Sequence, residues 1–597
     1  MCGIFGYAGK DSAAKVIING LKRLEYRGYD SWGVAIVPTF IEGSPYINLA
    51  KHIGKIGEVS ADNLFQVDSH IGIGHTRWAT HGGVTDVNAH PHFSTDKSFV
   101  LAQNGIVENY QELKAELISK GYEFISQTDT EIIVRLIEDE LKNGASGLHD
   151  AVRDAFLKLT GRNTIIVLDK NNNHIIAVRN GSPLVIGVGE EEVIIASDTL
   201  SFADRTNKVI LVENFQMIEY KEGTTKLYDV KTNAELEMSV TELDQEDTKV
   251  EKEGYDHFMI KEIVEQRYTV NEAVHYTLEE LTPFLERIKN SKGKVYTVGA
   301  GTAGFAAMQI AYFLRKFGKV NATELKAYEM QSYKDLFTPE DTLIAVSQSG
   351  ETADTIEAIE FAKEKGTKIA SIVNMLGSTI TRISDFQFFS RSGPEICVAS
   401  TKAFTAQSAW GLLVAMSLNN QFEEAKQVIK NLSKNLQKFF EGNDFIEIKT
   451  LADKLKNEEH FFVLGKGQNF VVALEGALKV KEITYKHFEG FAAGELKHGV
   501  IALIDQGTPV FGIISEDENK ADLLSALAEV KARGGYTIGV AKENNELFDY
   551  FIQTIDGKAA DSIANVVPFQ LLSYFMALEL GNSPDKPRNL AKSVTVK

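Results

Sequence analysis

The feature that most constrains the fold is a repeated unit in the C-terminal half, an apolar strand followed by a glycine-rich loop and a helix. KVYTVGAGTAGF begins at Lys294, and the similar stretch HFFVLGKGQNF begins at His460, about 165 residues later. DTLIAVSQSGETADTIEAIEFAKEKG, between the two, follows the same plan. Strands that alternate with helices indicate a parallel sheet covered on both faces. The repeat therefore predicts two related α/β domains with parallel sheets.

The N-terminal half has a different pattern. Short apolar strands such as GVAIVPTF, TIIVLDK and HIIAVRN alternate with Gly/Asn/Asp turns, and KNNN and NGSP indicate a meander of hairpins. ENYQELKAELISKG predicts a helix that stops at Gly121. These signals indicate an α+β domain with much antiparallel sheet. The acidic stretch TELDQEDTKVEKEGYD reads as a linker, with a charged helix face as the alternative.

These changes of pattern give the expected domain boundaries. We expect an N-terminal domain over 1–240, a linker over 241–253, α/β domains over 254–445 and 446–585, and a C-terminal tail over 586–597.

Composition excludes several classes of protein. The net charge of -19 argues against a nucleic-acid or anionic-membrane surface. Two cysteines form no disulfide framework, and the chain shows neither a secretory signal nor an apolar run long enough to span a bilayer. We therefore expect a cytoplasmic protein.

Three loops in the α/β half carry hydroxyl side chains ahead of a helix. SQSGET spans Ser347–Thr352, VASTKAFT begins at Val398, and GAGTAG begins at Gly299. Backbone N–H groups and the positive end of a helix dipole favour a phosphate at such a loop. The alternative for each is an ordinary helix cap with a tight turn. GAGTAG lacks the spacing of a dinucleotide motif, so the set favours a sugar phosphate.

Two further stretches of the α/β half carry proton-transfer groups. Lys479 and Glu482, in ALEGALKVKEITY, share one helix face, either as a solvated ion pair or as a buried general base with its partner. His498 could move protons or be structural. The tail PRNLAKSVTVK is either disordered or ordered enough for a lysine to form an imine with a sugar ketone.

The N-terminal half contains polar motifs in HTRWATHG, NAHPH, QNG and TDTE. Arg77 could grip a carboxylate, and Trp78 could be a lid or core. Asn104-Gly105 is either a hairpin turn or an oxyanion hole, and Asp129 either caps a helix or holds an ammonium group. The histidines lack acidic or cysteine companions at metal-binding spacings, so we expect no metal.

Cys2 is chemically special only if Met1 is removed. The freed α-amine, with an ordinary pKa of about 7.7–8.0, could then act as the base for the thiol. Cys2 would attack an amide, Asn104 and Gly105 would hold the oxyanion, and Arg77 and Asp129 would bind the α-carboxylate and α-ammonium of glutamine.

Taken together, the motifs resemble the glutamine–fructose-6-phosphate aminotransferase (isomerising) family essentially from end to end. CGIFGY, HTRWATHG, NAHPH, QNG and TDTE are similar to its class II glutamine amidotransferase domain, which has the N-terminal nucleophile fold. SQSGETADT, VASTKAFT, ALEGALKVKEITY, GELKHG and PRNLAKSVTV are similar to its two sugar isomerase (SIS) domains.

The resemblance implies a role for each matching residue. It implies that Cys2 is the nucleophile, Lys592 forms the imine, Glu482 moves a proton between C1 and C2, His498 of the partner subunit assists ring opening, and Lys479 assists. Trp78 would gate an ammonia channel. The implied glutamine-binding residues are Arg77, Trp78, Thr80, His81 and Asp129. The implied sugar-phosphate residues are Thr302, Ser347, Gln348, Ser349, Thr352, Val398, Ser400 and Ala591.

The resulting hypothesis is an enzyme that makes glucosamine 6-phosphate and glutamate from fructose 6-phosphate and glutamine, the first step of hexosamine synthesis. It would use no cofactor and act as a homodimer. The alternatives are a fructosamine-phosphate deglycase or other SIS isomerase with a degraded glutaminase half, and a non-catalytic sugar-phosphate sensor. Intact Cys2, Asn104 and Asp129 weigh against the former, and Glu482, His498 and Lys592 against the latter.

Overall fold

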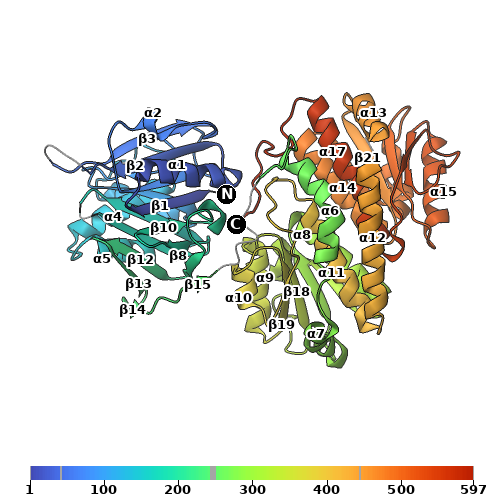
Figure 1. The fold of residues 1–597 in the computed structure, drawn as a ribbon, viewed down its shortest axis with the longest axis horizontal. Coiled ribbons are helices and arrows are strands. Elements are labelled where there is room, and N and C mark those ends of the chain that lie inside the picture. The colour runs from blue at the N-terminus through green and yellow to red at the C-terminus, as the bar shows by residue number, and fades with distance from the viewer. Residues whose placement is uncertain (1, 40–43, 172, 243–250, 443–444, 596–597) are drawn as a thin grey trace. The chain divides into compact units, whose positions relative to one another are not determined.

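The computed structural model describes residues 2–39, 44–171, 173–242, 251–442 and 445–595. The chain divides into two compact units, one of residues 1–249 with 593–597 and one of residues 250–592 (Figure 1). No helix in the described part of the chain is long and apolar enough to cross a membrane.

The first unit contains two antiparallel sheets, as the sequence predicts. Among the described residues, eight strands form one sheet, in the order β15 (Thr241–Glu242), β11 (Lys208–Leu211), β9 (Val185–Val188), β10 (Glu192–Ala196), β1 (Gly3–Gly9), β4 (Ile71–Arg77), β2 (Ser31–Val37) and β3 (Asn48–Ile53). Seven form the other, in the order β14 (Glu235–Leu236), β13 (Thr224–Asp229), β12 (Gln216–Lys221), β8 (His174–Asn180), β7 (Asn163–Asp169), β6 (Phe99–Gly105) and β5 (His92–Phe93).

Alternating side chains give this unit its layers. In β1, Ile4 and Ala8 join the core between the sheets, while Phe5 and Tyr7 face α1 (Ala13–Leu24). β6 alternates in the same way between the inter-sheet core and the outer core under three helices. These helices are α3 (Tyr110–Ser119), α4 (Thr130–Lys142) and α5 (Leu148–Leu157). The period of two therefore places helices on both outer faces of a two-sheet sandwich.

Two details of the sequence reading need correction. KNNN joins the antiparallel pair β7 and β8, but NGSP does not make a second hairpin, because β9 lies in the other sheet. Thr241–Glu242, the expected start of the linker, form β15. Linker residues 243–250 lie outside the described residues.

The second unit contains two five-stranded parallel sheets with the same strand order. The first is ordered β17 (Ala322–Lys326), β16 (Val295–Gly299), β18 (Thr342–Ser347), β19 (Lys368–Val373) and β20 (Phe386–Phe389). The second is ordered β22 (His487–Ala492), β21 (His460–Gly465), β23 (Pro509–Ile513), β24 (Tyr536–Ala541) and β25 (Tyr550–Gln553). Identical order supports the internal repeat that the sequence indicates.

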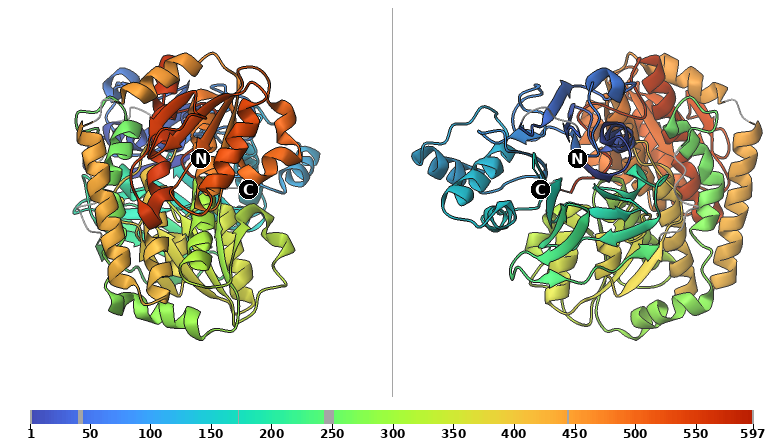
Figure 2. Two further views of the ribbon diagram at one scale, coloured as in Figure 1. Left: turned by 90° about the vertical axis from the view of Figure 1, so that its right-hand side faces the viewer. Right: turned by 60° about the vertical axis from the view of Figure 1, so that its left-hand side comes forward.

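Helices cover both faces of each parallel sheet (Figure 2). Ile344 and Val346 of β18 face the helical core that both domains share, while Leu343 and Ala345 face α9 (Ala353–Glu364). The shared core contains α6 (Phe258–Glu272), α7 (Leu278–Asn290), α8 (Gly301–Lys316), α11 (Lys402–Leu418), α12 (Phe422–Gly442), α13 (Ile446–Leu455), α14 (Gln468–Thr484) and α17 (Val567–Glu579). α15 (Lys520–Lys531) covers the other face of the second sheet. The contact between α8 and α14 joins the two domains.

The packing of α14 on α17 predicts an unusual response to a glycine substitution. Alanine normally stabilises a helix relative to glycine by about 0.5–1 kcal/mol. At Gly476, however, an added Cβ would lie 2.7 Å from Cγ of Phe569. We expect Gly476→Ala to destabilise the protein by about 1–3 kcal/mol through overpacking, measured by chemical unfolding. Gly442→Ala at the end of α12, where a Cβ meets nothing within 4 Å, is the control. Equal or greater stability of Gly476→Ala would contradict the packing argument.

Candidate active sites

The Cys2 thiol lies against the backbone of Trp78. Cys2 directly precedes β1, and the Trp78 N–H donates to Sγ at 3.3 Å while Sγ lies 3.5 Å from the Trp78 carbonyl oxygen. Arg27 Nε donates to the Cys2 carbonyl at 3.3 Å. Burial raises the pKa of the Cys2 thiol, so the group is protonated near neutral pH and needs a base to become a nucleophile. Met1, whose removal would free that base, lies outside the described residues.

Asn104 and Gly105 end β6 and do not form a hairpin turn. They pair with Thr164 and Asn163 of β7, which excludes the turn alternative. Gly105 has φ of +140°, and a Cβ there would lie 2.2 Å from the Arg162 carbonyl oxygen, so only glycine fits. The pair therefore ends a strand with a strained backbone and a buried amide.

The amide of Asn104 is oriented by two buried neighbours. His75 Nε2 lies 3.2 Å from Asn104 Oδ1 and 2.9 Å from the Gln103 carbonyl oxygen. Because both partners are acceptors, Nε2 carries the proton and donates. Asn104 Nδ2 then points the other way and donates to Ser197 Oγ at 2.8 Å. His75 and Ser197 were missed by the sequence reading, which weighed the histidines mainly as metal ligands.

His75, His90 and His92 form a row of buried, neutral rings, called here the histidine stack, in which the first pair is tilted and the second meets edge to face. Ring centroids are 4.4 Å apart for His75 and His90 and 5.0 Å apart for His90 and His92. Burial lowers the pKa of His75 to about 3, and burial also lowers the pKa values of the other two well below the ordinary value. Their Nε2 atoms lie 3.0 Å from the hydroxyls of Thr130 and Thr128, so these rings belong to a hydrogen-bonded network.

Arg77 and Asp129 are buried charges without an opposite charge in hydrogen-bond contact among the described residues. The Arg77 guanidinium donates to the carbonyl oxygens of residues 81–83, the closest being His81 at 2.5 Å. Asp129 precedes α4, but its side chain does not cap the helix; Oδ2 accepts from the Val107 N–H at 2.8 Å. Burial raises the pKa of Asp129. The helix-cap alternative is thereby excluded.

The remaining predicted glutamine-binding residues follow β4. Trp78 is partly buried and Thr80 is exposed. The His81 ring packs edge-on against Tyr110, with centroids 5.0 Å apart. The Arg77 guanidinium donates to the backbone carbonyls of residues 81–83, so it fixes the conformation of the loop that follows β4.

In the second unit, the SQSGET loop connects β18 to α9. Gly350 has φ of +67°, and its N–H donates to Ser347 Oγ at 2.9 Å. Ser347 Oγ lies 3.2 Å from Thr352 Oγ1, and Thr352 makes no side-chain cap of α9. Gln407 Nε2 donates to the Ser347 carbonyl at 3.1 Å. The hydroxyls therefore face one another across the loop, which argues against simple helix capping.

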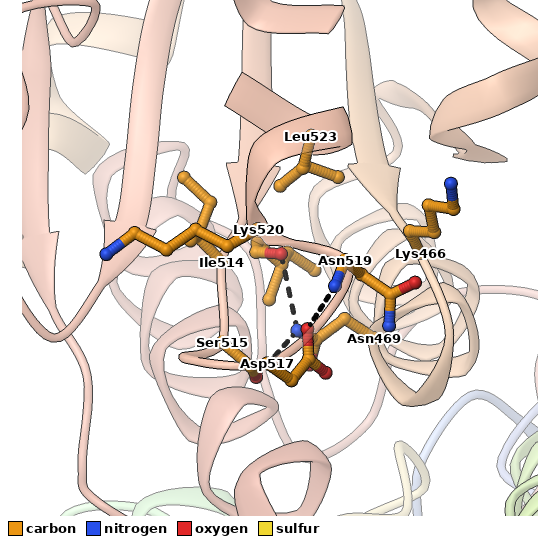
Figure 3. Close-up of a pocket in the computed structure, with 9 residues that line it drawn as sticks. Lys466, Asn469, Ile514, Ser515, Asp517, Asn519, Lys520 and Leu523 are labelled. Carbon is orange, nitrogen blue, oxygen red and sulfur yellow. Dashed lines mark hydrogen bonds between the residues drawn. The ribbon is translucent and has the colours of Figure 1, made fainter. Parts of the chain in front are cut away.

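The corresponding loop of the second α/β domain has a different chemistry. It follows β23 as ISEDEN, from Ile514 to Asn519, and carries three acidic residues. The Asp517 backbone and side chain accept from Lys520 N–H and Asn519 N–H (Figure 3). The remaining cavity is only about 10 Å³, about one water molecule. Only the first α/β domain keeps a hydroxyl-rich loop suited to phosphate.

Helix α14 aligns Glu475, Lys479 and Glu482 on one face. Lys479 is completely buried, and its Nζ lies 2.6 Å from Glu482 Oε2 and 3.5 Å from Glu475 Oε1. It also donates to Thr302 Oγ1 on α8 at 2.9 Å. Burial raises the pKa of Glu475 to about 8; burial alone would lower the pKa of Lys479, but the two carboxylates raise it. The solvated-pair alternative is wrong.

Glu475 was missed by the sequence reading. The signal was present, because residues 475, 479 and 482 are spaced i, i+4, i+7 in a helix rich in Ala, Leu and Val.

Lys592 in the tail is ordered and paired with Glu395. Its Nζ lies 2.5 Å from Glu395 Oε2 and 2.8 Å from the Cys397 carbonyl oxygen. Glu395 also accepts from Ser400 Oγ at 2.8 Å and from the N–H groups of Thr401 and Ala403 at the start of α11. Burial alone would raise the pKa of Glu395, but Lys592 and these donors lower it to about 2. The disordered-tail alternative is wrong at Lys592, and Glu395 is a second missed residue.

Glu395 also relates the tail to α14. Its carboxylate contributes to the raised pKa of Lys479, so the two charge clusters act on each other. Val398 and Ser400 lie in the loop between Glu395 and α11, and Ala591 is adjacent to Lys592. His498 lies at the exposed end of η5 (Ala493–His498), and its side chain makes no hydrogen bond or ion pair with any described residue.

The histidine stack predicts a pH dependence of stability. Below pH 6.5, His75 binds a proton in the unfolded chain. In the folded chain its pKa is about 3, so the ring stays neutral until the pH is much lower. The folded state therefore loses about 1.4 kcal/mol per pH unit for this ring as the pH falls from 6.5 toward 3. We expect His75→Gln to reduce this slope by about one proton, measured as opening free energies of β4 by hydrogen exchange.

His70→Gln is the control, because it replaces an exposed histidine of the same unit that lies outside the histidine stack. A wild-type slope in His75→Gln would show that His75 is not held neutral.

Comparison with known families matches most of the chain. A glutamine amidotransferase domain model matches residues 75–204. The SIS domain model matches twice, at residues 287–417 and 454–580.

Relatives match along the whole chain. The glutamine–fructose-6-phosphate aminotransferases [isomerizing] of Pyrococcus horikoshii and Chlorobaculum tepidum are each 40% identical, over 608 and 625 residues, with 100% of both chains covered. Among solved structures, the C-terminal domain of glucosamine-fructose-6-phosphate aminotransferase from Francisella tularensis is 33% identical with a TM-score of 0.51. It covers 57% of this chain and 100% of that chain.

The two SIS matches agree with the repeated parallel sheets, and the amidotransferase match lies within the antiparallel unit. The chain belongs to the glutamine–fructose-6-phosphate aminotransferase (isomerising) family.

Proposed function

We propose that this protein converts fructose 6-phosphate and L-glutamine to glucosamine 6-phosphate and L-glutamate. The observation that carries the proposal is the pair of preserved polar sites in one chain, one around Cys2 and Asn104 and one around Lys479 and Lys592. A deglycase would not need the site around Cys2 and Asn104. A non-catalytic sensor would not need the site around Lys479 and Lys592.

Glutamine hydrolysis starts at Cys2 after removal of Met1. The α-amine takes the thiol proton, and Sγ attacks the amide carbon of glutamine. Asn104 Nδ2 and the Gly105 N–H stabilise the oxyanion, for which Asn104 would exchange its resting partner Ser197. Collapse of the intermediate releases ammonia and leaves a glutamyl thioester, which water hydrolyses to glutamate.

Two buried charges suit the α-substituents of glutamine. Arg77 would bind the α-carboxylate, and Asp129 the α-ammonium; each lacks an opposite charge in contact among the described residues. Trp78, Thr80 and His81 would line the same substrate. Trp78 would also gate an internal passage for ammonia.

The sugar phosphate would bind at the SQSGET loop. Ser347, Gln348, Ser349 and Thr352 would hold the phosphate at the start of α9, with Thr302, Val398, Ser400 and Ala591 near the sugar. His498 of the partner subunit would assist ring opening, which fits the exposed position of this residue in the single chain. The active form would then be a homodimer.

Imine formation requires Lys592 to leave its ion pair. The neutral amine attacks C2 of the open-chain ketose and expels water; ammonia then replaces Lys592 at C2. Glu482 removes a proton from C1 and delivers a proton to C2, which gives the amino aldose. The buried Lys479 cation holds Glu482 in position throughout.

These assignments divide the chain as proposed from the sequence. Residues 1–240 would form the glutaminase, 254–445 and 446–585 the SIS domains, and 586–597 the active-site tail. The linker of 241–253 would begin only after Glu242, because Thr241 and Glu242 belong to β15 of the glutaminase sheet. The cytoplasm is the proposed location.

Separate variants test the two halves. We expect Cys2→Ala to abolish glutamine use and Lys592→Ala to abolish synthesis while keeping glutamine hydrolysis, both measured as glucosamine 6-phosphate and glutamate formed. Intact mass of the active protein should show loss of Met1. Glutamine use by Cys2→Ala, or normal synthesis by Lys592→Ala, would contradict the proposal.

Asn104→Ala tests the oxyanion assignment. Loss of one donor to an oxyanion typically lowers kcat by about 10²–10³-fold, with little change in KM. We expect that loss in glutamine hydrolysis, while isomerisation of fructose 6-phosphate persists. Asn109→Ala is the control, because this half-buried amide of the same unit donates to the Lys158 carbonyl oxygen. An unchanged kcat in Asn104→Ala would rule out its role as oxyanion donor.

A further inference from the structure

Three lysines line a cavity whose residues belong to none of the sequence motifs of the two candidate sites. Lys434 and Lys438 lie one turn apart on α12, and Lys558 begins the short helix η7 (Lys558–Ala560), just after the loop that follows β25. The cavity has a volume of about 270 Å³. Its lining is completed by Val428, Asn431, Leu432, Asn435, Asp556 and Gly557. In the second unit α12 packs against α6 and α11, and the cavity lies between α12 and residues 556–558, at the edge of the shared core to which Leu432 belongs.

The cavity has three lysines in its lining and one acidic residue, Asp556. None of the three lysines forms an ion pair with a described carboxylate, in a chain whose net charge is -19. Asp556, the acidic residue of the lining, pairs instead with Lys542 at 2.6 Å. The hydrogen bond from Lys542 is the main cause that lowers the pKa of Asp556, and the backbone N–H and the charge of Lys558 lower it further. Lys542 also lies 3.4 Å from Asp561. Like charges near one another are unfavourable unless an anion joins them.

The loop that supplies Lys558 is held in one conformation. Asn435 Nδ2 donates to the Asp556 carbonyl at 3.0 Å, and the Gly557 N–H donates to Asp561 Oδ1 at 3.0 Å. A Cβ at Gly557 would lie 2.7 Å from the Ala560 carbonyl oxygen. Lys558 has φ of +52°, a left-handed backbone that a lysine adopts only when its surroundings impose it.

We propose that this cavity is a binding site for a small phosphate-bearing anion, separate from the sugar-phosphate loop. Three lysine ammonium groups supply donors for phosphate oxygens, and Asn431 adds an exposed amide on the same face of α12. Val428 and Leu432 give the cavity an apolar side, where the organic part of a phosphate ester packs.

Lysine acetylation followed by mass spectrometry tests the site directly on the full-length protein. With inorganic phosphate or glycerol 3-phosphate added, we expect labelling of Lys434, Lys438 and Lys558 to fall several-fold. Lys430, on α12 but outside the cavity, should keep its labelling. Sodium chloride at matched ionic strength should protect none of them. Stronger protection by glycerol 3-phosphate than by phosphate identifies an organic ester as the ligand, and the reverse identifies the inorganic ion.

The loop offers a matched pair of variants. Lys558→Gly removes one charge and relieves the left-handed strain, so folding should be unharmed while the phosphate concentration that half-protects Lys434 rises about tenfold or more. Lys558→Arg keeps the charge and should stay near the wild type. The proposal is overturned if Lys430 is protected as strongly as Lys434, if chloride protects equally, or if Lys558→Gly has no effect. Because Lys430 and Lys434 report on α12 alone, these outcomes do not depend on the proposed synthase activity.

Discussion

The completely buried cation of Lys479 is the interaction on which the architecture of the second unit depends. An ammonium group removed from water is stable only if other charges and hydrogen bonds replace its hydration. Glu475 and Glu482 on the same helix and Thr302 on α8 provide that replacement. Because α8 and α14 come from different SIS domains, this cluster requires both domains to pack in register. The packing of the shared helical core therefore also positions the side chains of the proposed sugar site.

The two candidate sites use buried polarity in opposite ways. Around Asn104, the histidine stack is neutral, and it orients the amide. The protonated Nε2 of His75 holds Asn104 Oδ1, so that Nδ2 faces Ser197. Around Lys592, the groups are charged, and Glu395 stores the lysine as a cation in a site closed by Ser400 and the start of α11. A substrate entering this second site must compete with a carboxylate that stays ionised at any physiological pH. The Asn104 amide is therefore oriented before substrate arrives, whereas the Lys592–Glu395 ion pair must break before Lys592 can react.

The sequence was sufficient for the fold classes, the repeated parallel sheet and most of the polar residues, because these follow from local periodicity and from short motifs. It could not decide between alternatives that depend on partners distant in the chain. Asn104-Gly105 reads as a hairpin until β7 is seen to pair beyond it, and Asp129 reads as a helix cap until Val107 is found as its donor. Glu395 and Ser197 lie outside the motifs, and His75 begins HTRWATHG without a sign of its partner. The contacts of these three residues join positions that are 29 to 197 residues apart in the chain. The Lys479–Glu482 pair was visible as spacing, but its burial follows from packing against α8.

The acidic, nearly closed loop after β23 has a consequence for how the two repeats depend on each other. The first SIS repeat carries the hydroxyl-rich loop, and the second carries α14 with Lys479 and Glu482. Neither repeat alone therefore contains both groups of side chains. A cut between the repeats would separate the proposed phosphate loop from the proposed proton-transfer groups, so we expect neither fragment to isomerise a sugar phosphate by itself.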